Sequence, residues 1–426
     1  MIRRADSGAA LDAGLHRTVL PNGLTVLSEH VPGVRSVAFG AWVKAATIHE
    51  APAEQGVSHV LEHLVFKGTP TRSPRDLSFA LETLGGSLDA YTSRDHTAYQ
   101  ARVLDEHLDI AADVVGDLVF RPLLRREDWE LERGVILEEI AEMEDTPEDL
   151  VQELHNAQLW GAHPYGWSIL GTRETVGALD VSAVQRLHAR AYHPGLMVVA
   201  AAGNVTHEQL LAALDRTGWA AEPARDAAPL AAPAIPVIPP PVRRHVERKG
   251  TQTQLVFGAP SVHYAHPDRF AITLVSMLLG DGMSSRLFQK VREELALAYS
   301  VSSFTEFHQQ AGMHGVFLSA SPKKAVTAEQ VVRDELARLA TEGIPDDELV
   351  AGKRQLKGQV TLSLEGPSAR MHRAAASELY AAAYRPIDAV LAEIDALTPD
   401  HVRAVCARYF APDCQTVLSL GPGGSF

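Results

Sequence analysis

The 426-residue sequence contains only two cysteines, Cys406 and Cys414. Two cysteines cannot form a disulfide framework or a cysteine zinc site, and such low usage is typical of a reducing compartment. No stretch reaches the roughly 18 apolar residues that span a membrane, and the basic residues 1–17 lack the apolar core of a signal peptide. We therefore expect a soluble, cytoplasmic chain in which any metal is held by His, Asp or Glu.

Positive charge is also scarce, since 39 Lys and Arg stand against 53 Asp and Glu, for a net charge of −14. This balance argues against partners such as nucleic acid or an anionic membrane and favours cationic ligands. A phosphate-binding P-loop is missing as well, because neither Gly85-Gly86 nor Gly423-Gly424 is followed by Lys-Ser or Lys-Thr. A nucleotide-binding enzyme is therefore set aside.

The length is too great for one compact core, and residues 220–242 form an Ala- and Pro-rich segment without helical periodicity. We expect an N-terminal domain at 1–219, a linker at 220–246 and a C-terminal domain at 247–426. Short strings recur in order in both halves, first Phe39-Gly40-Ala41 and Phe257-Gly258-Ala259, then Ala90-Tyr91-Thr92 and Ala298-Tyr299-Ser300. These repeats predict a duplication, with each half a mixed α+β domain.

Two local signals describe the start of the first half. Pro21-Asn22-Gly23 lies between two β-like runs and predicts a hairpin, because Asn-Gly accepts the positive φ of a tight turn. Ser73-Pro74 predicts a helix start, and Gly85-Gly86 predicts its end.

The most informative motif is His59-x-x-Glu62-His63, within residues 56–66. At 100° per residue, five apolar residues gather on one side of this predicted helix and the polar trio lies on the other. Two imidazoles one turn apart can reach a single zinc ion. Glu62 beside them could take a proton from a water molecule activated by that ion, which is the chemistry of amide hydrolysis.

A catalytic zinc needs a third protein ligand and an open position. Residues 129–144 predict an acidic helix in which Glu132 and Glu139, seven residues apart, lie within about 20° of the same face. Either carboxylate could meet the histidines, and the alternative is a solvated acidic helix.

Together these residues resemble the pitrilysin/insulinase family of zinc metallopeptidases, in which an inverted histidine motif is followed by a distant glutamate. Here Glu139 follows His63 by 76 residues. The run Phe66-Lys67-Gly68-Thr69 points to the processing-peptidase branch and its bacterial two-domain relatives. Further blocks cover nearly the whole chain, at residues 88–99, 132–140, 168–176 and 284–300.

The resemblance implies that His59, His63 and Glu139 bind Zn²⁺, that Glu62 is the general base and that Glu132 steadies a ligand. It also implies that Arg292 and Tyr299 hold the substrate carbonyl and the oxyanion, where a guanidinium and a phenol are suitable donors. Without the resemblance, Arg292 would be read as a surface charge and Tyr299 as a core aromatic.

Substrate contacts are implied at two places. Residues 90–103 resemble the family's edge strand, to which an extended peptide adds, so we expect contacts from Asp89, Ala90 and Tyr91, with Phe66 nearby. The resemblance also implies that Asp149 and Glu153 match acidic positions that the processing branch uses for a basic residue just before the cut. The alternative for these two residues, four apart in sequence, is a solvated acidic helix.

The family architecture is a clamshell of two homologous halves, each a largely antiparallel sheet packed with helices and together enclosing a chamber. Residues 270–279, which correspond to the zinc helix, contain no ligands, so only the first domain should bind metal. The chain carries both the zinc set and a Gly280-Asp281-Gly282 turn, which favours a homodimer. We expect a zinc endopeptidase acting on unfolded peptides, basic ones included. The alternative is a non-catalytic scaffold of the same fold.

Overall fold

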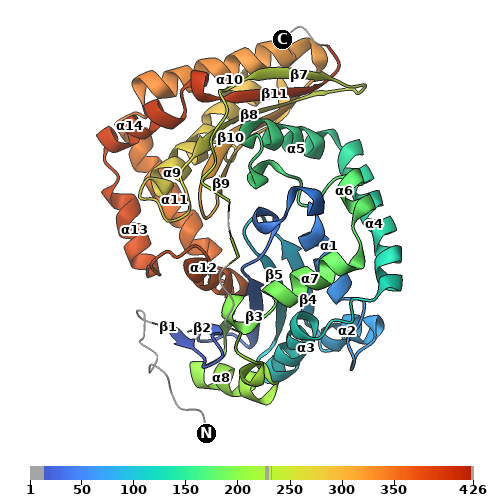
Figure 1. Ribbon diagram of the computed structural model, residues 1–426. Coiled ribbons are helices and arrows are strands. Elements are labelled where there is room, and N and C mark those ends of the chain that lie inside the picture. The colour runs from blue at the N-terminus through green and yellow to red at the C-terminus, as the bar shows by residue number, and fades with distance from the viewer. Residues whose placement is uncertain (1–13, 226–229, 232, 424–426) are drawn as a thin grey trace. The chain divides into compact units, whose positions relative to one another are not determined.

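The computed structural model describes residues 14–225, 230–231 and 233–423 (Figure 1). Two compact units are formed, and each contains one sheet. The first unit comprises Met1–Ile140, Ser168–Pro233 and Ser363–Pro386. The second comprises Ala141–Trp167, Ala234–Leu362 and Ile387–Phe426.

The first unit has a six-stranded sheet in the order β1-β2-β6-β3-β5-β4. Strands β2 and β6 are parallel, and the other neighbouring pairs are antiparallel. The strands are β1 Leu15–Val19, β2 Thr25–His30, β3 Ser36–Val43, β4 Ser87–Thr92, β5 Thr97–Leu104 and β6 Met197–Gly203.

Helices cover both faces of this sheet. The hydrophobic core on one face includes residues of α1, α3, α7 and α8, and a second core on the other face includes α12. Strand β6 is buried along its whole length and alternates between the two cores, as a strand with both faces covered must. The helices are α1 Val57–Val65, α2 Pro74–Glu82, α3 Leu108–Phe120, α4 Arg126–Asp145, α6 Arg173–Ala178, α7 Val181–Ala191, α8 His207–Arg216 and α12 Pro367–Leu379.

The second unit has a five-stranded sheet in the order β7-β11-β8-β10-β9, with β7 and β11 parallel. Its strands are β7 Arg243–Glu247, β8 Thr253–Ser261, β9 Ala298–Phe307, β10 Gly312–Ala320 and β11 Thr416–Gly421. Its helices are α5 Pro147–Trp160, α9 Arg269–Gly280, α10 Pro322–Glu342, α11 Asp346–Ser363, α13 Ile387–Ala396 and α14 Pro399–Tyr409.

The predicted α+β class is confirmed, with each sheet largely antiparallel but mixed, because each contains one parallel pair. The unit boundaries differ from a simple cut at the linker. Helix α5 precedes the linker yet packs on β8 and β11, while α12 follows it yet packs on β2, β3 and β6. The described residues between 222 and 242 form no helix or strand, and β7 begins inside the predicted linker.

The repeated glycines explain how these helices fit. A Cβ on Gly40 of β3 would lie 2.6 Å from the Trp42 ring and 3.4 Å from Met371 of α12. A Cβ on Gly258 of β8 would lie 2.3 Å from the His155 ring of α5. The distances of 2.6 Å and 2.3 Å are shorter than normal van der Waals contact. Only glycine therefore leaves room for the Trp42 and His155 rings at these two positions.

Local predictions can be compared with the strands and helices. The hairpin is confirmed, with Val19 opposite Thr25 and Gly23 at φ +91°. The helix after Ser73 is confirmed as α2, whose Asp76 amide donates to the Ser73 hydroxyl. The alternating stretch 90–103 is divided between β4 and β5 by a turn at residues 93–96, so only β4 lies at the edge of the sheet. Among the described residues, no helix has the length and apolar character to cross a membrane.

Candidate metal centre

Helix α1 carries the histidine motif and buries one face, as its periodicity predicts. Its buried apolar residues are Val57, Val60, Leu61, Leu64 and Val65. The helix starts after Gly56, which has φ +91°, and Glu50 holds this end. The Glu50 carboxylate accepts the amide hydrogens of Gly56 at 2.9 Å and Ser58 at 2.8 Å. Burial raises the pKa of Glu50 to about 7.

Three side chains of the first unit converge on one point. His59 and His63 project from α1, and Glu139 projects from α4. Glu139 Oε2 lies 3.8 Å from Nε2 of His59, and Oε1 lies 3.6 Å from Nε2 of His63. Among the described residues, this is the one group of three or more His, Cys, Asp or Glu whose candidate ligand atoms lie within 4.8 Å of one another.

The donor set fits a zinc ion. Ligands at about 2.1 Å from a tetrahedral zinc are separated by about 3.4 Å, close to the spacing here. Glu139 Oε2 is buried without a hydrogen-bond partner among the described residues, which is energetically unfavourable. A cation between this oxygen and the imidazoles would supply the missing partner. Burial lowers the pKa of His59 to about 3, so the His59–Glu139 contact is not an ion pair at neutral pH. A neutral imidazole is also the form that binds metal.

Glu132, also on α4, lies on the other side of His63. Its Oε2 is 3.1 Å from Nδ1 of His63, and its Oε1 pairs with the Lys67 ammonium at 2.5 Å. When the proton of the His63 ring is on Nδ1, it donates to this carboxylate, and the Nε2 lone pair is then directed toward Glu139. The structure thus separates the two carboxylates that the sequence left as alternatives.

Glu62 lies beside the cluster and contacts β4. The hydroxyl of Thr92, the last residue of β4, donates to Oε2 of Glu62 at 2.6 Å. Burial raises the pKa of Glu62, and the hydrogen bond from Thr92 opposes that shift. A half-buried carboxylate is therefore held next to the three donor residues.

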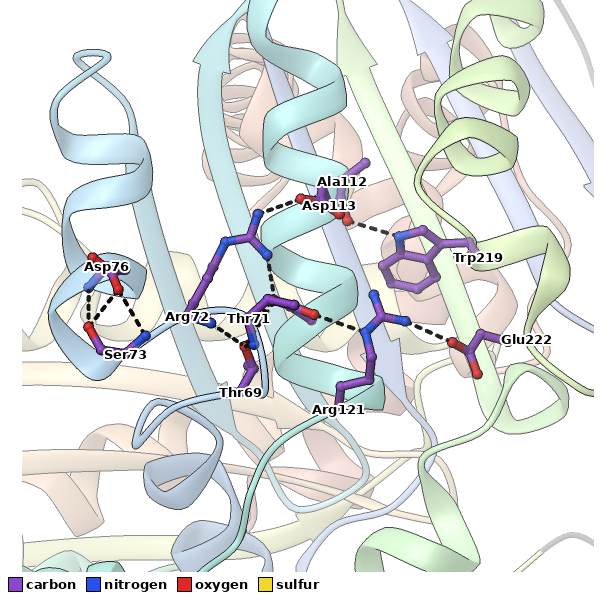
Figure 2. A network of polar contacts seen from close by, with 11 residues as sticks. Thr69, Thr71, Arg72, Ser73, Asp76, Ala112, Asp113, Arg121, Trp219 and Glu222 are labelled. Atoms are coloured by element: carbon purple, nitrogen blue, oxygen red, sulfur yellow. Dashed lines mark hydrogen bonds and ion pairs between the residues drawn. The ribbon is translucent and has the colours of Figure 1, made fainter.

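The loop after α1 is fixed by a polar network (Figure 2). Asp117 of α3 accepts the hydroxyl hydrogens of Thr69 at 3.0 Å and Thr71 at 2.5 Å, and it also pairs with Arg72. On the same loop, the Lys67 carbonyl accepts from the Arg125 guanidinium at 3.2 Å, directly before α4 begins. These bonds tie the end of α1 to α3 and to the start of the helix that carries Glu139.

The other residues predicted to contact substrate in the first unit lie directly after α1 or on strand β4, which contacts α1. Phe66 follows α1 directly and packs against the core. Asp89, Ala90 and Tyr91 lie on edge strand β4, with Asp89 exposed. Tyr91 packs in the core on the α12 face of the sheet, whereas Ala90 packs in the core that contains α1.

Four predicted residues belong to the second unit instead. The Arg292 guanidinium stacks on the Tyr299 ring, with its carbon 4.3 Å from the ring centroid, and Tyr299 is 75% exposed. Arg292 lies in a π-helical segment, Phe288–Glu294. Asp149 and Glu153 lie on α5, one exposed and the other half-buried. Within the first unit the structure therefore brings together His59, Glu62, His63, Glu132 and Glu139 only.

Sequence reasoning missed three residues that position this centre: Glu50, Thr92 and Asp117. Each acts through a partner elsewhere in the chain, and none belongs to the histidine motif. Lys67, within the quoted Phe66–Thr69 run, also contacts the centre through Glu132, and the sequence alone does not reveal that pairing.

Comparisons with known proteins show the family to which the chain belongs. The family model described as insulinase, peptidase family M16, matches residues 25–173, and the peptidase M16 inactive domain model matches residues 178–356. A Streptomyces coelicolor protein named an uncharacterized zinc protease is 40% identical over 92% of this chain and 86% of its own length. A Bacillus subtilis protein with the same description is 32% identical over 96% of this chain and 99% of its own.

Solved structures support the same fold. The crystal structure of a protease from Helicobacter pylori has a TM-score of 0.90 at 21% identity, covering 96% of this chain and 99% of that one. A peptidase M16 inactive domain from Pseudomonas fluorescens has a TM-score of 0.88 at 21% identity, covering 96% and 98%. The fold and the paired domain models define a two-domain chain of the peptidase M16 type. The chain belongs to peptidase family M16, the insulinase family, as its sequence motifs predict.

Proposed function

We propose that this protein is a zinc-dependent endopeptidase. The observation that carries the proposal is the convergence of His59, His63 and Glu139 on one point with the Glu62 carboxylate beside them. Membership of the family and the name zinc protease given to the Streptomyces coelicolor and Bacillus subtilis relatives support it.

In this proposal His59, His63 and Glu139 hold the metal, and Glu132 orients His63 through Nδ1. A bound zinc ion supplies a Lewis acid that polarises the scissile carbonyl and lowers the pKa of water. The Glu62 carboxylate takes the proton from the attacking water and passes it to the leaving nitrogen. The chain thus contributes both the base and the fixed geometry of the donors.

The proposed substrates are extended peptides. Strand β4 lies at the edge of its sheet and pairs with β5 alone in the described sheet, so half of its backbone groups can bond an added strand. Such pairing reads the backbone more than the side chains. The net charge of −14 favours basic peptides.

Finer expectations from the resemblance stay predictions. They are the processing-peptidase branch, the enclosing chamber, the homodimer, the oxyanion roles of Arg292 and Tyr299, and selection of basic residues by Asp149 and Glu153. The alternative of a non-catalytic scaffold is favoured by one observation, that the second domain model is described as inactive. Against it stands the complete donor set in the first unit.

Substitution of the base tests the proposal. The purified parent should bind about one zinc per chain and cleave a quenched basic peptide. Glu62→Gln should keep the zinc and lose cleavage by about 100- to 10,000-fold, because the amide cannot take up the proton. Glu138→Gln is the matched control, since this exposed neighbour of Glu139 has no place in the donor set.

Two outcomes would contradict the proposal. Cleavage by Glu62→Gln at the parental rate would show that the assigned base is wrong. A zinc-loaded parent that cleaves no member of a peptide library would favour the scaffold.

A further inference from the structure

Thr92 joins two parts of the proposed site that the sequence motif does not connect. It is the last residue of edge strand β4, and its hydroxyl donates to Oε2 of Glu62 on α1. We propose that Thr92 is a positioning residue that holds the Glu62 carboxylate in a fixed orientation relative to a peptide bound along β4. This inference rests on the proposed function and assigns a further residue to it.

The end of β4 is anchored on both faces of the sheet, so Thr92 offers a fixed donor. On the α12 face, the hydroxyl of Tyr91 lies 3.3 Å from Nε1 of Trp42 and 3.3 Å from Nε2 of His96. On the other face, Ala90 packs in the core that contains α1. Directly across the ladder Thr92 pairs with Thr97, which is fully buried and donates to the Ala45 carbonyl.

The chemistry of the contact suits a positioning role. At 2.6 Å it is a hydroxyl–carboxylate hydrogen bond of the charge-assisted kind, stronger than a bond between neutral groups. Threonine is β-branched and therefore has few χ1 rotamers, whereas a free glutamate side chain has three rotatable bonds. A carboxylate has about four acceptor sites, so this bond restricts the rotation of the Glu62 carboxylate and leaves capacity to take a proton from water.

A purely structural reading is that Thr92 only satisfies a half-buried carboxylate. The two readings differ in what a substitution changes. If the bond is structural, its loss lowers stability and leaves the turnover of folded enzyme unaltered. If it positions the base, its loss lowers kcat while zinc binding and stability stay close to parental values.

The experiment compares Thr92→Val, which removes the hydroxyl at nearly constant shape, with Thr92→Ser, which keeps it. Thr217→Val is the matched control, because Thr217 is also half-buried and donates one 2.8 Å hydroxyl bond, to the Ala213 carbonyl. Each full-length variant is measured for kcat and KM on a quenched peptide, for zinc affinity by chelator competition and for Tm.

We expect Thr92→Val to lose about 10- to 100-fold in kcat, since small misplacements of a catalytic group have effects of this size. KM and zinc affinity should stay within about twofold, and Thr92→Ser should restore kcat to within about threefold of the parent. A crystal structure of zinc-loaded Thr92→Val should show the Glu62 carboxylate rotated from its parental orientation.

The inference is overturned if Thr92→Val keeps the parental kcat, if its loss matches a loss of zinc or of Tm, or if Thr92→Ser does not restore turnover. Failure of the proposed function is distinguishable, because then the parent itself does not cleave or Glu62→Gln cleaves normally. If Glu62→Gln has lost cleavage while Thr92→Val cleaves at the parental rate, the role of Thr92 is overturned and the proposed function stands.

Discussion

The two units share a framework but differ in their side chains. Leaving out β1, the first sheet runs β2-β6-β3-β5-β4 and the second runs β7-β11-β8-β10-β9, with the parallel pair at the same place in each. The helix that next follows the strand with the Phe-Gly-Ala string is α1 in one unit and α9 in the other. Helix α1 presents two histidines and a glutamate, whereas α9 reads RFAITLVSMLLG and has no such donor.

The difference teaches that this framework does not by itself make a metal centre. Both helices bury apolar residues, but α1 leaves His59, Glu62 and His63 only partly buried, whereas residues 274–280 of α9 are all buried. The site in the first unit also depends on a carboxylate from a later helix. Substitutions in the shared framework should therefore lower the stability of whichever unit carries them. Substitutions at the position of a metal donor should affect zinc binding only in the first unit.

The largest effect is expected at a donor. His63→Ala should weaken zinc binding by more than about 100-fold, since loss of even an outer partner of a metal ligand costs about 10- to 100-fold. A matched change in the other unit, Thr273→Ala on α9, should leave zinc binding and peptide cleavage unchanged, because the Thr273 hydroxyl donates to the Arg269 carbonyl of its own helix and is no part of the donor set. Chelator competition measures both variants. Equal loss of zinc in the two would break the comparison.

The next largest effect is expected on stability, at the glycine that both units place in the Phe-Gly-Ala string, Gly40 and Gly258. Gly258→Ala should lower the free energy of unfolding by about 3 kcal/mol, because its Cβ would lie 2.3 Å from the fully buried His155 ring. Gly40→Ala should behave similarly, through the Trp42 ring. Chemical denaturation measures the effect, with Gly358→Ala in helix α11 as the control, since its added Cβ meets nothing within 4 Å. If Gly258→Ala is as stable as that control, the proposed crowding is absent.

A smaller effect concerns pH. Burial lowers the pKa of His155 and of His314 in the second unit to about 4. The unfolded chain takes up these protons near pH 6.5 while the folded chain does not, so stability should fall as the pH drops from about 6.5 toward 4. At pH 5 each histidine should cost about 2 kcal/mol relative to pH 7.5. Denaturation at the two pH values measures this.

His314→Gln provides the matching variant for the pH test. Its amide can still donate to the Tyr409 carbonyl, which lies 2.8 Å from Nε2 of His314, but it does not titrate. Between pH 7.5 and pH 5, the free energy of unfolding of the variant should therefore fall by about 2 kcal/mol less than that of the parent. The same loss of stability in parent and variant would contradict the assignment.

Much of the first unit could be predicted because its signals are local. The periodicity of residues 57–65 defined α1, and Asn22-Gly23 defined a hairpin. Spacing alone left Glu132 and Glu139 as alternatives, because both lie on one face of α4, and the assignment of Glu139 as the ligand came from the family resemblance. The packing of α4 against α1 places the two carboxylates on different sides of His63. The turn at residues 93–96 was missed because it contains neither glycine nor proline and is built by the Ser93 side chain.

The assignment of helices to sheets was beyond local reasoning. Residues 147–160 and 367–379 both show helical patterns, but periodicity does not say which sheet a helix covers. Asp149 and Glu153 were accordingly placed in the predicted N-terminal domain, although the helix that carries them packs in the second unit. Contacts across hundreds of residues decide this point, such as His155 with the Thr416 carbonyl.

The packing of α12 has a consequence for synthesis. On the ribosome, the six strands of the first sheet are complete by residue 203, yet the segment that covers one of its faces, Pro367–Leu379, emerges more than 160 residues later. At about 5–20 residues per second, that apolar surface stays uncovered for roughly ten seconds or more during translation. The N-terminal half expressed on its own would keep this surface exposed and should therefore aggregate more readily than the full chain.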